Sequence, residues 1–453
     1  MQKYLFKNIS VVNEGKVFVG DVLIDKGRIG RIGGSLNVKE KVTEINGDGK
    51  HLLPGVIDDQ VHFRDPGLTH KADLSSESKA AVAGGVTSFM EMPNTIPNAL
   101  TQQILEEKYS NAARKSLANY SFYMGVSNDN TDEVLRTNDK RRKVCGIKIF
   151  LGASTGNMLV ENEEAIKKIF SESELLIATH CENEKIIKAN YESLKLSKEK
   201  LEASDHPIIR DTEACYSSSS NTVALAKRYG SRLHVLHIST AKELDLFIND
   251  QPLSQKRITS EVCVHHLHFT ADDYERLGYL IKCNPAIKSP ENKKALWAGL
   301  LDGRLDVIAT DHAPHTLEEK EPPYKHAHAG LPLVQHSLQL MLQYQSEDAI
   351  SLEKVVEKMS HAVADCFKIE ERGYIREGYW ADLVLLDLKD PYQVSADNLF
   401  YKCKWSPLNG ARFNASVLNT FVNGNCVFDS SASLYGNSFF DESLKGERLL
   451  FNP

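Results

Sequence analysis

The stretch LPGVIDDQVHFRDPG, residues 53–67, decides how the rest of the chain is interpreted. It has the composition of a short apolar strand that ends in several ionisable residues and a proline–glycine turn. Because strand side chains alternate between faces, Asp58, Gln60 and His62 are expected on one face and Asp59 on the other. A carboxylate, an amide and an imidazole on one face at the end of a strand predict a metal or substrate site.

Downstream of this stretch, strand-like and helix-like segments alternate. Helical patterns cover 99–116, 161–171 and 217–229. The candidate strands are 56–63, 87–92, 120–126, 145–151, 175–181, 232–238, 258–265 and 306–311. Eight βα units predict an α/β fold, a TIM-type (β/α)8 barrel, whose functional groups gather at the carboxyl ends of the strands. A doubly wound sheet is the rival, but no G-x-G-x-x-G motif follows the first strand.

The two ends of the chain have a different pattern. Short β-rich runs separated by glycine turns fill residues 1–52, and further strand candidates lie at 382–387, 415–422 and 426–428. Hairpins this small seldom form a stable sheet alone. We therefore predict one composite β-sandwich domain from residues 1–53 and 372–453, beside a catalytic barrel of residues 54–371.

The overall composition is that of an ordinary globular protein, with 42% hydrophobic and 25% charged residues. The net charge of −7 argues against nucleic acid as a partner. None of the eight cysteines forms a CxxC pair, which favours a reducing compartment. The N-terminus lacks the apolar core of a signal peptide, and no apolar run is long enough to span a membrane. We expect a cytoplasmic protein with no membrane partner.

Ionisable and polar side chains stand at the ends of five candidate strands. They are Gln60, His62, Lys148, His180, His237 and Asp311. Each alone has a structural explanation, such as a hydrogen-bonded histidine or a helix-capping aspartate. Together at the mouth of one barrel they predict a hydrolytic metal site, because imidazole and carboxylate are the usual ligands of zinc. The histidines of the run 263–268 are not expected to bind metal, because they alternate faces or fall in the following loop.

Several of these motifs resemble those of the dihydroorotases, a family of cyclic amidohydrolases, and the resemblance covers nearly the whole chain. The motifs are 54–58, 62–67, 92–95 (MPNT), 284–286 (NPA), 309–315 (ATDHAPH), 373–378 and 381–385. The resemblance implies a TIM barrel flanked by a composite β-domain, which agrees with the prediction from the pattern. It also implies a homodimer.

The resemblance further implies a zinc site in which His62, His180, His237 and Asp311 are ligands. Lys148 matches a position where many members carry a carboxylated lysine that bridges two zinc ions. Burial favours that modification, because an amine must be neutral to capture CO₂ and burial lowers a lysine pKa. Other members use an aspartate three residues further on, where this chain has Leu151. Two zinc ions are favoured over one.

Gln60 is the one serious departure from the family motif, which has a histidine there. An amide oxygen is a weaker ligand than imidazole. Two outcomes are open: Gln60 coordinates weakly and the Lys148 carbamate compensates, or the site holds one zinc ion. Asp58 either assists on the same face or is a structural hydrogen-bonding residue.

The activity implied by the resemblance is the reversible hydrolysis of L-dihydroorotate to N-carbamoyl-L-aspartate, a step of pyrimidine synthesis. A zinc-bound hydroxide would attack the ring amide, with Asp311 as general base and then acid. Arg64 would bind the substrate carboxylate. The remaining substrate contacts would come from Asn94, Asn284, His315, Ala329 and Gly330.

Two alternatives are carried forward. An allantoinase-like or hydantoinase-like enzyme would act on a ring without the carboxylate, and Arg64 argues against it. A non-catalytic scaffold subunit would explain Gln60, but it would have no need for ligand-type side chains at a barrel mouth. The loop 313–331 either closes over the substrate or is an ordered surface loop.

Overall fold

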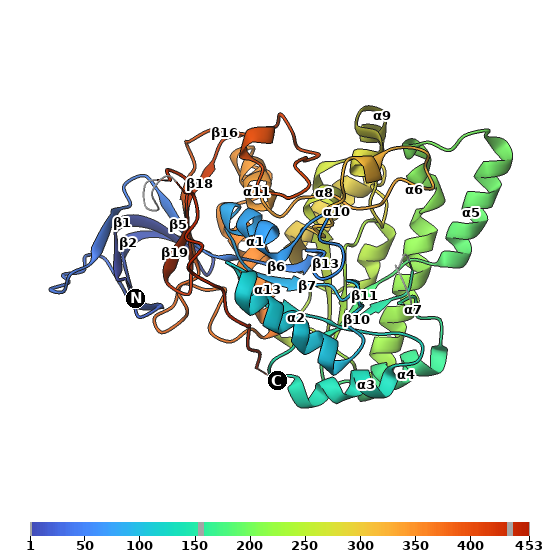
Figure 1. Ribbon diagram of the computed structural model, residues 1–453, viewed down its shortest axis with the longest axis horizontal. Helices are drawn as coiled ribbons and strands as arrows, with labels where there is room; N and C mark the ends of the chain where they lie inside the picture. Colours follow the sequence, from blue (N-terminus) through green and yellow to red (C-terminus); the bar gives the residue numbers. More distant parts are fainter. Residues whose placement is uncertain (1, 153–157, 433–437, 453) are drawn as a thin grey trace.

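The computed structural model describes residues 2–152, 158–432 and 438–452. Strands from the two ends of the chain lie side by side in one eight-stranded sheet, drawn in blue and red in Figure 1. Its main path is β19-β18-β15-β5-β1-β2-β3, and β4 pairs with β1. The strands are β1 (Tyr4–Asn13), β2 (Lys16–Asp25), β3 (Arg28–Gly33), β4 (Thr43–Asn46), β5 (His51–Pro54), β15 (Leu383–Asp387), β18 (Ser416–Val422) and β19 (Asn425–Asp429).

The join between the two ends of the chain is the pairing of β5 with β15. Leu53 stands opposite Val384 in an antiparallel register, while β5 runs parallel to β1 on its other side. Phe6 of β1 packs edge-on against Phe421 of β18, with ring centroids 5.3 Å apart. The predicted C-terminal strands and their pairing with the N-terminal hairpins are therefore present. The exact division of the chain at residues 53 and 372 stays a prediction.

Parallel strands in chain order form the centre of the larger part. They are β6 (Val56–Val61), β7 (Val86–Glu91), β8 (Asn119–Phe122), β9 (Met124–Gly125), β10 (Ile147–Phe150), β11 (Ile177–His180), β12 (Leu233–Val235), β13 (Ile258–Cys263) and β14 (Val307–Ala309). One sheet holds β6 to β8 and another holds β9 to β14. Tyr123 lies between β8 and β9. Its backbone amide donates to the carbonyl of Glu91, and the amide of Met124 donates to the carbonyl of Gly146. The segment 119–125 thus pairs with a strand on each side and links the two sheets.

The first and last of these strands meet at a single point. Val61 and His312 form an isolated parallel bridge, and the amide of His62 donates to the carbonyl of His312 at 2.7 Å. All eight predicted strands are present. The second, β7, has the predicted length but begins one residue earlier, the third is divided into β8 and β9, and the other six are shorter than expected. In the described part of the chain the pairing does not form a continuous closed ladder, so closure of the eight-stranded barrel stays a prediction.

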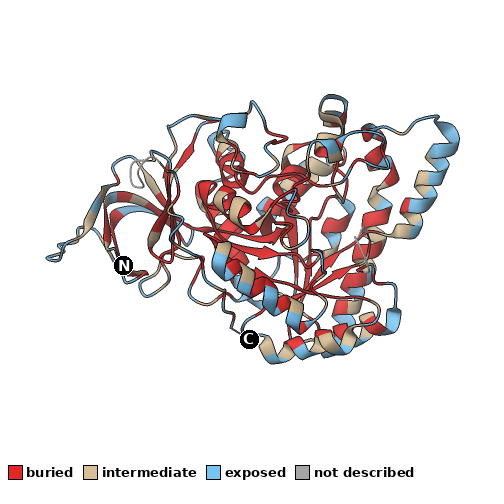
Figure 2. Cartoon of the chain, viewed as in Figure 1, coloured by how far each residue is buried: buried red, intermediate tan, exposed pale blue. Residues whose placement is uncertain are grey.

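Helices cover the outside of these strands (Figure 1). They are α1 (Leu74–Ala83), α2 (Gln102–Lys115), α3 (Thr131–Leu135), α4 (Glu163–Glu172), α5 (Glu184–Ser197), α6 (His206–Ile209), α7 (Thr212–Tyr229), α8 (Val264–His268), α9 (Tyr274–Leu277), α10 (Pro290–Asp302), α11 (Ser337–Ser346), α12 (Leu352–Val356) and α13 (Ala362–Phe367). In Figure 2 the central strands are buried, while the helices expose their outer faces. None of the described helices is long and apolar enough to cross a membrane.

Short single-turn helices and one small ribbon complete the structure. The ribbon pairs β16 (Tyr392–Gln393) with β17 (Arg412–Phe413). The short helices are η1 (Arg136–Lys140), η2 (Ala203–Asp205), η3 (Lys242–Leu246), η4 (Leu253–Gln255), η5 (Ala271–Asp273), η6 (Gly278–Ile281), η7 (Glu318–Lys320), η8 (Glu357–His361, a π-helix) and η9 (Ala396–Asn398). All eight cysteines are free, and seven of them are buried.

Candidate active site at the carboxyl ends of the strands

A cavity of ≈ 280 Å³ opens at the carboxyl ends of the parallel strands. Every site residue predicted from the sequence lines it, from six different strand ends and the loops that follow. These residues are Gln60, His62, Arg64, Asn94, Lys148, His180, His237, Asn284, Asp311, His315, Ala329 and Gly330. The fold therefore brings together side chains that are up to 270 positions apart in sequence, as a parallel βα arrangement does.

The metal-type donors face one another in two pairs. His62 Nε2 lies 3.1 Å from Asp311 Oδ1, and His180 Nδ1 lies 3.0 Å from His237 Nε2. Imidazole nitrogen and carboxylate oxygen are the donors of hydrolytic zinc sites. The arrangement also fits a cation because three buried polar atoms around it, Lys148 Nζ, Gln60 Oε1 and His237 Nδ1, have no hydrogen-bond partner within the described residues.

Burial sets the protonation of these side chains. It lowers the pKa of His62 and takes the pKa of His237 well below its ordinary value, so both imidazoles are neutral, the form that binds metal. Burial alone would raise the pKa of Asp311, but the hydrogen bond with His62 and nearby positive charge such as that of Lys148 outweigh it and lower that pKa. Burial also lowers the pKa of Lys148 to about 7, which leaves a large fraction of neutral amine near neutral pH.

Three residues of the cavity have a backbone conformation that side chains other than glycine rarely adopt. The φ angles are 65° at Arg64, 41° at His237 and 45° at Asp311. Such conformations cost roughly 1–3 kcal/mol each and concentrate at functional sites. Each residue follows the end of a strand, so the strained turn aims its side chain into the cavity.

Irregular pairing of β6 changes the faces expected for the opening stretch. The register with β7 shifts between Asp58 and Val61, and Gln60 and His62 both line the cavity. Asp58 accepts hydrogen bonds from the amide and hydroxyl of Thr310, which supports its structural interpretation. Asp59 was expected on the face opposite Gln60, but at this irregularity it points toward His234 on β12 while Gln60 lines the cavity.

Arg64 stands on the side of the cavity formed by the loop after β14. Its Nε donates to the carbonyl of Pro314 at 3.2 Å, and its Nη2 lies 3.1 Å from His315 Nε2. Burial lowers the pKa of Arg64 to about 10, so the guanidinium is still charged at neutral pH. Only 7% of Arg64 is exposed, so an anion bound to it would be largely desolvated.

Two amide side chains predicted to bind substrate also hold histidines. Asn94 Oδ1 lies 2.8 Å from His62 Nδ1, which orients the imidazole toward Asp311. Asn284 Oδ1 lies 3.1 Å from His206 Nε2. Both amides line the cavity as well, so these contacts leave their predicted substrate role untested.

Sequence analysis missed Glu182 and Arg210. Glu182 Oε2 lies 2.9 Å from His180 Nε2 and also accepts a hydrogen bond from Arg210, which lines the cavity. Burial would raise the pKa of Glu182, but Arg210 and His180 lower it to about 2. The order His180-Cys181-Glu182 was the available signal, whereas Arg210, placed between α6 and α7, had none.

The histidine run after β13 also differs from its predicted conformation. The strand ends at Cys263, and the histidines lie in α8 rather than alternating along a strand. Donor atoms of Cys263, His265 and His266 lie within 4.8 Å of one another. Whether they bind metal is untested, and the prediction that they do not stays a prediction.

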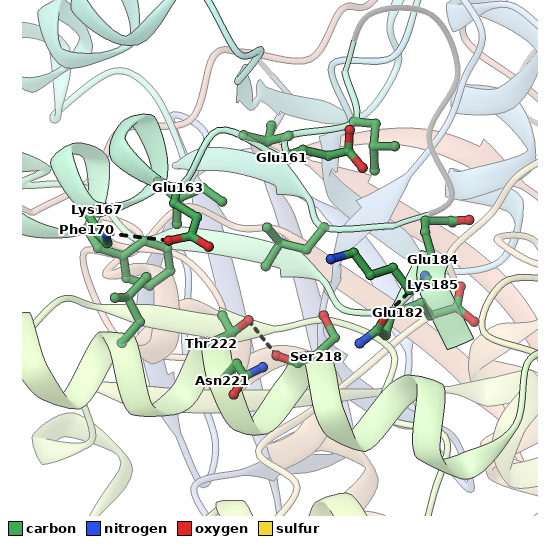
Figure 3. A pocket seen from close by; sticks show the side chains of 16 residues that line it. Glu161, Glu163, Lys167, Phe170, Glu182, Glu184, Lys185, Ser218, Asn221 and Thr222 are labelled. Carbon is green, nitrogen blue, oxygen red and sulfur yellow. Dashed lines mark hydrogen bonds and ion pairs between the residues drawn. The ribbon is translucent and has the colours of Figure 1, made fainter. Parts of the chain in front are cut away.

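A second, larger cavity of ≈ 460 Å³ lies between α4, α7 and the start of α5 (Figure 3). Its lining combines apolar side chains such as Phe170 with Ser218, Asn221 and Thr222. Glu182 reaches this cavity too, but none of the predicted ligands lines it. The donor atoms suited to hydrolysis therefore gather in the smaller cavity.

Comparison with known proteins agrees with this site. The model of the amidohydrolase family matches residues 51–427. The chain belongs to the amidohydrolase family. It is 32% identical to a dihydroorotase of Halobacterium salinarum over 93% of this chain and 95% of the relative. It is 31% identical to an allantoinase of Desulfitobacterium hafniense, over 94% of this chain and 95% of the relative.

A solved structure shares the fold. The L-hydantoinase (dihydropyrimidinase) of Arthrobacter aurescens superimposes with a TM-score of 0.88 at 29% identity, covering 94% of this chain and 96% of that one. The predicted resemblance to dihydroorotases and the prediction of a hydrolase that acts on cyclic amides are confirmed. The substrate itself is not fixed, because the relatives include enzymes named for different rings.

Proposed function

We propose that this amidohydrolase is a dihydroorotase, which interconverts N-carbamoyl-L-aspartate and L-dihydroorotate in pyrimidine synthesis. The observation that carries the proposal is Arg64, a buried guanidinium in the same cavity as the metal-type donors. Dihydroorotate carries a carboxylate on its ring, and a guanidinium binds a carboxylate through two parallel hydrogen bonds. Hydantoin and allantoin rings lack that carboxylate.

His62, His180, His237 and Asp311 would hold zinc, with Lys148 as a carboxylated bridge between two ions and Gln60 as a weak ligand. Zinc in such a site lowers the pKa of a water molecule to about 7 and polarises a carbonyl group. The supporting observations are the two donor pairs and the unpartnered buried atoms of Lys148 and Gln60.

Asp311 would carry the proton between water and the ring nitrogen. Its Oδ1 accepts a hydrogen bond from Gln60 Nε2 at 3.0 Å and lies against His62 Nε2, so Oδ2 is the oxygen that would exchange the proton. The lowered pKa keeps Asp311 ionised at the start, as a general base requires. In the synthetic direction the same carboxyl group would act first as the acid.

The substrate would lie between Arg64 and the donors of the strand ends. Arg64 would bind the carboxylate, assisted by His315 and Asn94. Asn284 and the backbone at Ala329 and Gly330 would hold the ring amide. Two facts support these assignments: all of these residues line the same cavity, and Arg64 carries a positive charge.

A substrate screen tests the proposal against its rivals. Purified protein supplied with zinc and bicarbonate should hydrolyse dihydroorotate with far higher kcat/KM than hydantoin or allantoin. Turnover of either rival ring without dihydroorotate would overturn the substrate assignment, and the allantoinase relative makes allantoin the necessary comparison. No turnover and no bound zinc would instead favour a scaffold subunit. A homodimer and a cytoplasmic location stay predictions.

A further inference from the structure

Asp59, His234 and Glu261 form a second group of donor atoms within the central strands. They come from β6, β12 and β13, and their donor atoms lie within 4.8 Å of one another. All three residues are 0% exposed. The predicted ligands of the cavity are different residues. This group, called here the inner cluster, therefore needs its own physical explanation.

The hydrogen bonds of His234 determine which of its nitrogens carries the proton. Nδ1 lies 2.7 Å from the hydroxyl oxygen of Thr259, and that hydroxyl donates its own hydrogen to the carbonyl of Leu233. In this arrangement Thr259 accepts from Nδ1–H, so Nδ1 carries the proton of a neutral His234. A neutral His234 then directs the lone pair of Nε2 toward the carboxylates of Asp59 and Glu261.

A lone pair that faces two carboxylates is repulsive unless a cation lies between them. Asp59 Oδ2 is 3.1 Å and Glu261 Oε2 is 3.9 Å from His234 Nε2. Neither contact has hydrogen-bond geometry. Within the described residues, His234 Nε2, both oxygens of Asp59 and Glu261 Oε2 have no hydrogen-bond partner. Buried atoms that have no hydrogen-bond partner in the described part of the chain are therefore present on all three residues, whose donor atoms lie within 4.8 Å of one another.

The charge at this point favours a cation strongly. Burial alone would lower the pKa of His234, but Asp59 and Glu261 raise it to about 9. The same field acts on a metal ion. Two carboxylates and a neutral imidazole carry a formal charge of −2, which one divalent ion neutralises. Without the ion, protons on His234 and on Glu261, whose pKa burial raises to about 7, would have to balance the carboxylates instead.

We propose that the inner cluster is a structural binding site for a divalent metal ion, with zinc as the ion to test. Tetrahedral zinc with bonds of about 2.0–2.1 Å places its ligand atoms roughly 3.3 Å apart. The observed separations of 3.1 and 3.9 Å bracket that spacing. Thr259 fixes the tautomer of the imidazole ligand, as partners of metal-bound histidines do. The site does not depend on which ring the enzyme hydrolyses.

The inner cluster also touches the cavity through one hydrogen bond. Glu261 Oε1 accepts from the backbone amide of His237 at 2.9 Å, while Oε2 faces His234. His237 is one of the strained residues with positive φ. An ion that holds Glu261 in place would therefore support the backbone that aims His237 into the cavity.

Metal content in a variant that lacks three of the cavity ligands tests the proposal. In His62→Asn/His180→Asn/Asp311→Asn protein, produced in zinc-supplemented medium, we expect about one zinc ion per chain by mass spectrometry of the dialysed protein. Adding Asp59→Asn should remove it. Asp58→Asn is the matched control, because Asp58 is an adjacent buried carboxylate that bonds to Thr310 instead, and it should leave the zinc in place.

Two results would overturn the proposal. One is a variant without zinc, which would mean that protons on His234 and Glu261 balance the carboxylates instead. The other is zinc that survives Asp59→Asn and is lost with Cys263→Ser, which would place it at the neighbouring cysteine–histidine group. If a variant does not fold, crystals of the unaltered protein decide: anomalous scattering at the zinc edge should give a peak between Asp59, His234 and Glu261, and its absence refutes the site.

Discussion

Replacing Arg64 should separate recognition of the substrate carboxylate from the chemistry of the strand ends. A guanidinium has five N–H groups, and Arg64 uses one on Nε for Pro314 and one on Nη2 for His315. Three are left, enough for a bidentate carboxylate. Each hydrogen bond to a charged group contributes about 1.5–3 kcal/mol, and truncating one partner of a buried charge pair costs about 2–5 kcal/mol.

Arg64→Gln should therefore lose about 3–5 kcal/mol of transition-state binding for dihydroorotate, which is roughly 150- to 5,000-fold in kcat/KM. Arg64→Lys keeps the charge but not the fork, and should lose about 10- to 150-fold. Steady-state assays with dihydroorotate measure both. Dihydrouracil, the same ring without the carboxylate, is the control substrate and should change little.

An equal loss on dihydrouracil would show that Arg64 supports the cavity rather than the carboxylate. Unchanged kcat/KM for dihydroorotate in folded Arg64→Gln protein would refute the role altogether. Thermal unfolding of each variant checks that the buried position still folds, because Arg64 is only 7% exposed.

Four further outcomes are expected. Gln60→His should raise zinc affinity in competition titrations if Gln60 faces the metal, and unchanged affinity contradicts that placement. Glu182→Gln should weaken zinc binding about 10- to 100-fold, because partners that orient a metal-bound histidine have effects of that size; wild-type affinity would show that Glu182 serves stability only. Arg372→Ala breaks the buried ion pair with Asp382 and should lower the free energy of unfolding in urea by about 3–5 kcal/mol. Arg376→Ala breaks the more exposed pair with Glu14 and should lower it by less than about 1 kcal/mol. Equal losses would refute the distinction between the two pairs. Burial lowers the pKa of His336 to about 3, so the unfolded chain takes up a proton below about pH 6.5 and the folded chain does not. Stability therefore falls with acid, by about 2 kcal/mol at pH 5, and His336→Gln should remove that part of the pH dependence of unfolding.

The sequence determined the elements and the identity of the cavity. Several hydrophobic runs have the length of a strand and end in Gln60, Lys148, His180 or Asp311. This pattern depends only on which residues are neighbours in the sequence. Since parallel strands put their carboxyl ends at one edge, the convergence of these side chains follows from the pattern. The same holds for Arg64, which comes directly after the first strand.

Tertiary structure decided what local order does not encode. Arg210 reaches the cavity only because α6 and α7 place it against Glu182. Asp59 faces His234 and Glu261 because the pairing of β6 is irregular, a property of its contacts with β7 rather than of its own residues. Alternation predicts the face of a side chain from the sequence of one strand. A register shift depends on the pairing of two strands. Contacts between residues far apart in sequence therefore set the inner cluster, while the strand ends by themselves predicted the cavity.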